Sequence, residues 1–343
     1  MCCKKDNFVC ETHKKAVKEH SLYPAEQCYR YIEEIIDGSI IRLYQSIDNF
    51  IFQDIDYSKV RSIMPQWVSD AGVGPELACT KVAYEALRRN ASHPIFSKFV
   101  YHYDLWGKVA AIQDRLSAVI MFMRQFYNIV PCTANYDESQ YTSAARCGGE
   151  RETEAHMLLN SIFVAYASVF DLLSKISVEQ FEFNKYDFTM YKKMRSSDVI
   201  YRKSLNNIDP SLKTEGMLFS EPAVIRKIET FRNEFVHNGP WDLRCSVYYT
   251  AVNGEPADVV IYSPDMDELG NFITSGSRNK FYSQANRINI QLPDLINAAS
   301  GVLKNTIEQI STLYRNCTTR KISREYTEEC LAAIGSYYAS LNK

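Results

Sequence analysis

Hydrophobic residues recur at helical spacing through several long segments of the chain. The segment 26–53 carries Ile32, Ile36, Leu43 and Ile47 near that spacing, although Gly38 weakens the prediction of one continuous helix. Prolines are expected to open the helices that start at 75 and 293, since proline suits the first helical position. The pattern predicts helices over residues 26–53, 75–89, 99–129, 151–178, 221–238, 293–316 and 323–342.

The period changes after the helix predicted over residues 221–238. Two β-rich stretches, 245–252 and 257–263, flank Asn253-Gly254, which is typical of a β-hairpin near residues 245–263. Residues 131–149 form a polar segment without periodicity and are expected to be a loop, and residues 180–220 are expected to be irregular. The sequence therefore predicts a mainly α protein with an inserted β-hairpin, in two parts: an N-terminal helical extension (1–95) and a helical domain (96–343).

Charge excludes a strongly basic nucleic-acid coat, because the 343 residues carry 39 Lys and Arg against 41 Asp and Glu. The distribution is uneven, however. Residues 273–324 hold eight basic and two acidic side chains, a net +6, and residues 185–232 hold ten basic and six acidic, a net +4, with aromatic residues between them. Such segments are typical either of an RNA-binding surface or of a solvated charged face.

No membrane span is expected, because the uncharged apolar stretch 155–170 has 16 residues and a span needs about 20. No apolar leader follows Met1, so a cytoplasmic protein with its ten cysteines reduced is expected. Cys3, Cys10, His13, His20 and Cys28 lack the paired spacing of zinc modules, and no phosphate-binding glycine motif is present. We therefore predict neither a metal nor a cofactor.

The helix predicted over 151–178 has a polar stripe opposite its apolar face. On a wheel of 100° per residue, Asn160, Ser161, Ser168 and Asp171 fall together. The opposite arc is broad and apolar, and it comprises Leu158, Leu159, Ile162, Ala165, Tyr166, Val169, Phe170, Leu172 and Leu173. A stripe of this kind faces either water or a polar site.

The helix predicted over 221–238 places a cation on its apolar face. Arg232 falls inside the arc of Val224, Ile225, Ile228, Phe231, Phe235 and Val236. A guanidinium is not buried alone, so Arg232 needs a partner, and Glu229 or Asp171 is a candidate.

His237 lies in the last turn of the same helix, where the helix dipole favours the imidazolium and a histidine suits acid–base chemistry. Arg232 and His237 are about 140° apart on a regular helix. They would converge on one substrate only if the helix end is distorted or a second copy of the helix faces the first.

The segment Arg232-Asn233-Glu234-Phe235-Val236-His237 resembles the R-(polar)-x-x-x-H signature of the HEPN superfamily, helical domains that include ribonucleases of toxin–antitoxin, phage-defence and CRISPR systems. The position of the signature at a helix end, before Asn238-Gly239, and the earlier helix carrying Asp171 match that pattern. The resemblance covers residues 100–316 in pattern and is specific only around 155–173 and 228–241.

The resemblance implies a HEPN-like helical bundle that cleaves RNA without a metal, as a homodimer joined through the Arg232/His237 helix. His237 would move a proton and Arg232 would stabilise charge on the phosphate. Asn233 would orient His237 or the phosphate, and Asp171 and Glu229 would hold Arg232, with Asn160 and Asn238 in support. An antitoxin or sensor protein would be a further partner.

A non-catalytic HEPN-like module that binds RNA, a nucleotide or a protein is the alternative, and modification by a companion enzyme is a third, weaker interpretation.

Overall fold

The computed structural model describes residues 25–52, 94–130, 144–189, 191–203, 205–242, 244–252 and 255–317, together with residues 80–82, 85, 89, 332 and 336. Most of the helices predicted over 75–89 and 323–342 lie outside the described residues. So does much of the predicted extension, namely residues 1–24 and 53–79.

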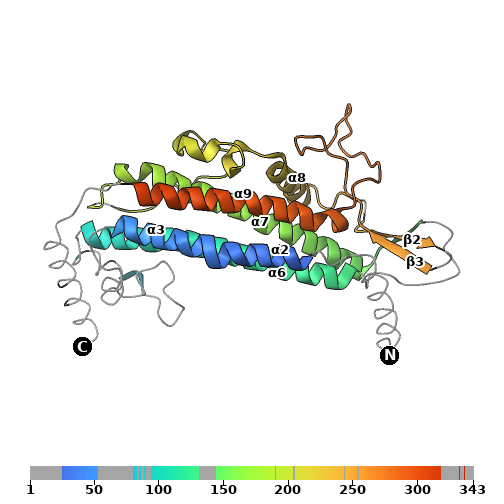
Figure 1. Cartoon of the computed structure of the whole chain (residues 1–343), viewed down its shortest axis with the longest axis horizontal. Coiled ribbons are helices and arrows are strands. Elements are labelled where there is room, and N and C mark those ends of the chain that lie inside the picture. Colours follow the sequence, from blue (N-terminus) through green and yellow to red (C-terminus); the bar gives the residue numbers. More distant parts are fainter. Residues whose placement is uncertain are drawn as a thin grey trace. The chain divides into compact units, whose positions relative to one another are not determined.

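The described part of the chain is mainly helical, as predicted. Its helices are α2 (Ala25–Glu34), α3 (Ile41–Ile51), α6 (Pro94–Ile129), α7 (Glu150–Glu182), α8 (Ala223–His237) and α9 (Ile288–Asn316) (Figure 1). A π-helix (Ile35–Ile40) joins α2 to α3. Between α7 and α8 the chain forms short 3₁₀ turns at Phe183–Lys185, Leu205–Asn207, Pro210–Lys213 and Leu218–Ser220.

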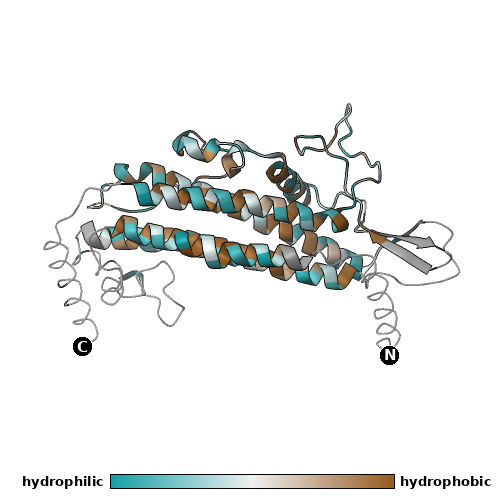
Figure 2. Cartoon of the chain, viewed as in Figure 1, coloured by the Kyte–Doolittle hydropathy of each residue, from teal (hydrophilic) through white to brown (hydrophobic). Residues whose placement is uncertain are grey.

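The chain divides into two compact units that share the long helices. The first unit comprises residues 1–37, 114–169 and 215–304, and the second comprises residues 38–113, 170–214 and 305–343. Hydrophobic and hydrophilic residues alternate along the long helices, as Figure 2 shows. This alternation buries one face of each helix within its unit.

In the first unit, α9 is the helix against which three others pack. The Cys28 thiol of α2 donates to the Pro293 carbonyl at 3.6 Å, and the Tyr127 hydroxyl of α6 donates to the Asn289 carbonyl at 2.8 Å. The Tyr166 hydroxyl of α7 hydrogen-bonds the Ser300 hydroxyl, with both side chains fully buried. These contacts connect four helices through buried polar groups, each of which has a partner.

Pro293 lies inside α9 rather than at its start, which corrects the predicted opening of this helix. The helix begins at Ile288, so Pro293 removes an N–H that would bond the carbonyl four residues earlier, that of Asn289. The Tyr127 hydroxyl bonds that carbonyl instead. A side chain from α6 thus compensates for the missing helical bond, which local sequence reasoning could not anticipate.

The π-helix corrects the prediction of one continuous helix over residues 26–53. It contains Gly38, the residue that weakened that prediction. Ile35, Ile36 and Ile40 are all buried, because the wider turn changes the phase between the apolar positions of α2 and those of α3. Local widening at a residue of low helix propensity therefore keeps the apolar side inward.

In the second unit, buried polar and aromatic side chains connect α3 with α6, with the 3₁₀ turn that follows α7, and with α9. His102 Nε2 lies 2.7 Å from Asp48 Oδ1, which also accepts the Trp106 indole N–H at 2.8 Å. Phe50 contacts the rings of Phe183 and Tyr314 edge-on, at 4.4 and 5.2 Å between centroids.

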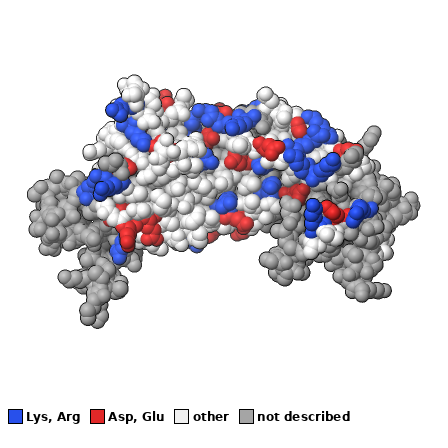
Figure 3. Space-filling view, turned by 180° about the vertical axis from the view of Figure 1, so that it is seen from behind, with Lys and Arg blue, Asp and Glu red and all other residues white. Residues whose placement is uncertain are grey.

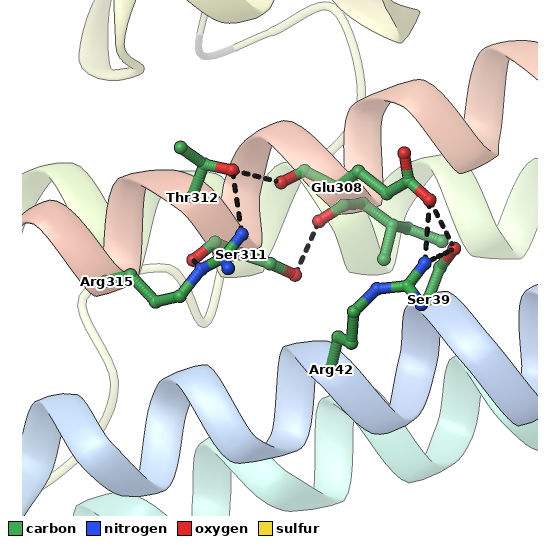
Figure 4. Close-up of polar contacts among 7 residues, drawn as sticks. Ser39, Arg42, Glu308, Ser311, Thr312 and Arg315 are labelled. Atoms are coloured by element: carbon green, nitrogen blue, oxygen red, sulfur yellow. Dashed lines mark hydrogen bonds and ion pairs between the residues drawn. The ribbon is translucent and has the colours of Figure 1, made fainter.

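A surface network joins the π-helix and α3 to α9 in the same unit (Figure 4). Arg42 Nη2 donates to Glu308 Oε1 at 2.8 Å, and the buried Ser39 hydroxyl donates to the same oxygen at 3.1 Å. About half of the Arg42 side chain is exposed, so the pair contributes little to stability beyond fixing the register of the two helices.

Three strands form an antiparallel sheet in the order β1-β2-β3. The strands β2 (Val247–Val252) and β3 (Glu255–Val260) occupy the region predicted as a hairpin. The strand β1 (Ala144–Cys147) lies within residues 131–149, which were expected to be a loop throughout. Its four residues have no alternation of their own, and pairing with β2 defines them as a strand.

Candidate functional site

The helix α8 carries the predicted site and is a regular α-helix to its last residue, His237. It follows Pro222, whose backbone is extended, and it ends where the Asn238 N–H donates to the Glu234 carbonyl at 2.8 Å. Gly239 then takes a positive φ of 86°, which favours glycine. Because α8 is regular, the distortion that would bring Arg232 and His237 together on one copy is absent.

Aromatic packing fixes α8 within the first unit. The rings of Phe163 in α7 and Phe231 in α8 stack at 4.9 Å between centroids, and Trp241 packs on Phe235 at 4.7 Å. The Trp241 indole N–H donates to the Tyr262 carbonyl at 2.8 Å. The chain after the helix end is therefore held against the buried face of α8.

Arg232 is half-buried, and its guanidinium Nη1 donates to Asn233 Oδ1 at 2.8 Å. This places a predicted pair of site residues in direct contact. Asp171, predicted as a partner of Arg232, accepts the Tyr201 backbone N–H at 2.8 Å within the second unit. Glu229, the other predicted partner, is half-buried on α8.

The outer side of α8 is open to solvent at its C-terminal end. Asn233, His237 and Asn238 are exposed, and so is Val236 with 48% of its surface accessible. The helical wheel places Val236 in the apolar arc, but the structure does not bury it. The buried arc is rotated away from Val236 and runs through Ile225, Ile228, Phe231, Glu234 and Phe235.

Glu234 is the residue that sequence reasoning missed. It lies inside the signature segment, only 4% of its surface is exposed, and its carboxylate forms an ion pair with Lys280. Its Oε2 also accepts the Asn238 side-chain amide at 2.8 Å. A signal was present, because Glu234 is three positions after Phe231, about 60° away on the helix, and four before Asn238.

The polar stripe on α7 is used mainly by the helix itself. The Ser161 and Ser168 hydroxyls each donate to the carbonyl four residues earlier, at 2.8 Å. Asn160 is half-buried, and its Oδ1 is a buried atom with no hydrogen-bond partner among the described residues. Of the predicted stripe, Asn160 therefore retains capacity for a polar partner.

Two other histidines are buried and have structural roles. His156 Nε2 donates to the Ser246 carbonyl at 3.0 Å, and burial lowers the pKa of His156 below its usual range. Burial lowers the pKa of His102 in the same way, against the opposing effect of Asp48. Both therefore favour the neutral form. His237, in contrast, is exposed to solvent.

Among the described residues, no group of three or more His, Cys, Asp or Glu is arranged to hold a metal ion. Of the cysteines and histidines that the sequence analysis weighed for a metal site, only Cys28 lies within the described part of the chain, where it is buried and reduced. One helical stretch, Glu150–Lys185, is long and apolar enough to cross a membrane by length and composition, with 56% of its most apolar window buried. Buried core helices meet the same criteria, so this is weak evidence for a span.

Comparisons with known proteins gave no match to any family model, curated protein or solved structure.

Proposed function

We propose that the protein is a metal-independent endoribonuclease of the HEPN type, which cleaves RNA by transesterification. The observation that carries the proposal is the end of α8, where the exposed His237 terminates the helix and the Arg232 guanidinium is tied to Asn233 on the same helix. An imidazole that moves protons and a guanidinium that stabilises charge on the phosphate both suit such a reaction.

In the proposed reaction the ribose 2′-oxygen attacks the adjacent phosphorus. The new P–O bond forms as the bond to the 5′-oxygen breaks, giving a 2′,3′-cyclic phosphate and a free 5′-hydroxyl. One imidazole takes the 2′-hydroxyl proton, and a protonated imidazole supplies the proton to the leaving oxygen. Arg232 stabilises the charge that develops on the phosphate oxygens.

Two copies of α8 make this division of labour feasible. Arg232 and His237 are about 140° apart on a regular helix, so a single copy does not direct both at one phosphate. A second copy facing the first would supply the complementary pair, with one His237 as base and the other as acid. Asn233 would keep the Arg232 guanidinium in orientation through their 2.8 Å hydrogen bond.

The test is cleavage of single-stranded RNA by the purified protein in EDTA, with analysis of the product ends. We expect the wild type to leave 2′,3′-cyclic phosphates, and His237→Ala and Arg232→Ala to lose activity by about 100-fold or more. Arg226→Gln is the matched control, because Arg226 is also on α8 and its ion pair is with Glu221.

Loss of activity in the control to the same extent would assign the effect to α8 stability instead. RNA binding without cleavage by the folded wild type would favour the alternative, a non-catalytic module.

A further inference from the structure

A short loop beside α8 combines aromatic and basic side chains. Residues 278–287, here called the aromatic-basic loop, contain three basic side chains, two aromatic ones and no acidic residue. Figure 1 shows this part of the chain as an irregular segment next to α8. On the face seen in Figure 3, clusters of Lys and Arg are separated by Asp and Glu, so the described residues form no continuous basic surface on that face.

Two contacts fasten the loop to the C-terminal end of α8. Lys280 forms its ion pair with Glu234, three residues before His237, and the Tyr282 hydroxyl donates to the Trp241 carbonyl at 2.7 Å. Three helical residues span about 4.5 Å along the axis. The loop is therefore anchored within one turn of the proposed catalytic histidine.

Asp265 also holds the loop in place. The Asp265 N–H donates to the Phe281 carbonyl at 2.7 Å, and its carboxylate accepts the Ser283 N–H and hydroxyl and the Asn286 amide at 2.8 Å. Gln284 has a positive φ of 65°, a conformation that a non-glycine residue adopts only when its surroundings impose it. The loop backbone is thus fixed before any ligand arrives.

Two rings nevertheless remain open to solvent on this fixed backbone. Phe281 is 37% exposed and Tyr282 is 41% exposed. Three carboxylates of this region are engaged: Glu234 pairs with Lys280, Asp265 accepts bonds from Ser283 and Asn286, and Asp242 accepts the Tyr248 hydroxyl. Arg278 and Arg287 are exposed within the same loop. Exposed aromatic and arginine residues in one loop suit a ligand with flat rings and negative charge.

We propose that the aromatic-basic loop binds single-stranded RNA, with Phe281 and Tyr282 stacking on bases and Arg278 and Arg287 contacting phosphates. This inference rests on the proposed function and deepens it, because it assigns the substrate surface beside His237. Single-stranded RNA is favoured because its bases are free to stack, whereas those of a duplex are already stacked on one another.

The experiment measures binding of a labelled single-stranded oligoribonucleotide by fluorescence anisotropy. The background is His237→Ala, which prevents cleavage during the titration. We expect Phe281→Ala to weaken RNA binding by about 5- to 100-fold. Phe281→Tyr should bind RNA as tightly as the parent, because tyrosine keeps the aromatic ring that stacks on a base. Phe181→Ala is the matched control, a phenylalanine with 44% exposure on α7 in the other unit, and should bind as the parent does. A duplex of the same sequence should bind more weakly and without dependence on Phe281.

Three results would overturn the inference. The first is equal binding by Phe281→Ala and its parent, and the second is equally tight, Phe281-dependent binding of the duplex. The third is absence of RNA binding together with a change in oligomer size on Phe281→Ala, which would identify the loop as a protein interface. If the wild type cleaves RNA but Phe281→Ala does not change RNA binding, only the role of the loop is refuted. Phe281-dependent binding by a wild type that never cleaves refutes only catalysis.

Discussion

The Glu234–Lys280 ion pair provides a sharp test of the site's architecture, because its two members differ in burial. Glu234 is 4% exposed, while the Lys280 side chain is 29% exposed. If Lys280 is replaced by Met, the Glu234 carboxylate keeps only the Asn238 amide as a described hydrogen-bond donor. If Glu234 is replaced by Gln, the new side chain can still accept that amide, and Lys280 can turn toward water.

The magnitudes follow from this asymmetry. Breaking a buried pair so that one charge stays uncompensated costs about 3–5 kcal/mol, and partial access to water places Lys280→Met near 3 kcal/mol. Glu234→Gln retains a neutral hydrogen bond and releases an ammonium that can be solvated, so it should cost about 1 kcal/mol. The double variant should be close to Glu234→Gln alone, because no unpaired charge remains buried.

Urea unfolding followed by circular dichroism at neutral pH would compare the four proteins through their midpoints and slopes. We expect the order of stability to be wild type, then Glu234→Gln and the double variant together, then Lys280→Met. A Lys280→Met protein that is as stable as Glu234→Gln would refute the reasoning, since it would mean that Glu234 gains no protection from the ammonium.

Two further predictions concern buried polar groups in the first unit. Tyr127→Phe should lower the free energy of unfolding by about 1–2 kcal/mol, because the Asn289 carbonyl loses its hydrogen-bond donor. In a Pro293→Ala background, residue 293 regains the N–H that can bond this carbonyl, so the same substitution should cost less than half as much. A double-mutant cycle that shows no coupling between the two positions would contradict this prediction. His156 has a lowered pKa in the folded state, so it stabilises the fold fully above pH 6.5 and progressively less as the pH falls through the lowered pKa. His156→Gln, which can still donate to the Ser246 carbonyl, should therefore show a smaller loss of urea midpoint between about pH 7 and 5.5 than wild type, and parallel pH curves would argue against it.

Sequence pattern located α8 closely but placed its buried face incorrectly. The sequence predicts a helix over residues 221–238, and the structure has it from Ala223 to His237. The agreement is close because Pro222 and Asn238-Gly239 are local signals for the start and the end of a helix. The buried arc depends on tertiary contacts instead. Glu234 is buried because Lys280, far along the chain, neutralises it, and Val236 is exposed because nothing in the described first unit covers it. Neither fact is encoded in the helix's own sequence.

The other discrepancies have the same origin. Pro293 is tolerated inside α9 because Tyr127 supplies a hydrogen bond from another helix. The strand β1 exists through its pairing with β2, which is a hundred residues away in sequence. The candidate site shows most clearly what residue spacing cannot predict. The sequence pattern grouped Arg232, Asn233 and His237, whereas only the structure shows the aromatic-basic loop anchored beside them. Long-range partners of this kind have no signature in residue spacing.

Asn289 has a consequence for the behaviour of the sheet edge. Its side-chain amide donates to the Val259 carbonyl and accepts the Ile261 N–H, so one side chain occupies two main-chain groups on the outer side of β3 and just beyond it. These are the groups through which an edge strand recruits another strand from a neighbouring molecule. The Asn289 side chain therefore takes the place of a neighbouring strand at this position. It prevents a strand of another molecule from pairing there, which removes one site at which aggregation could begin.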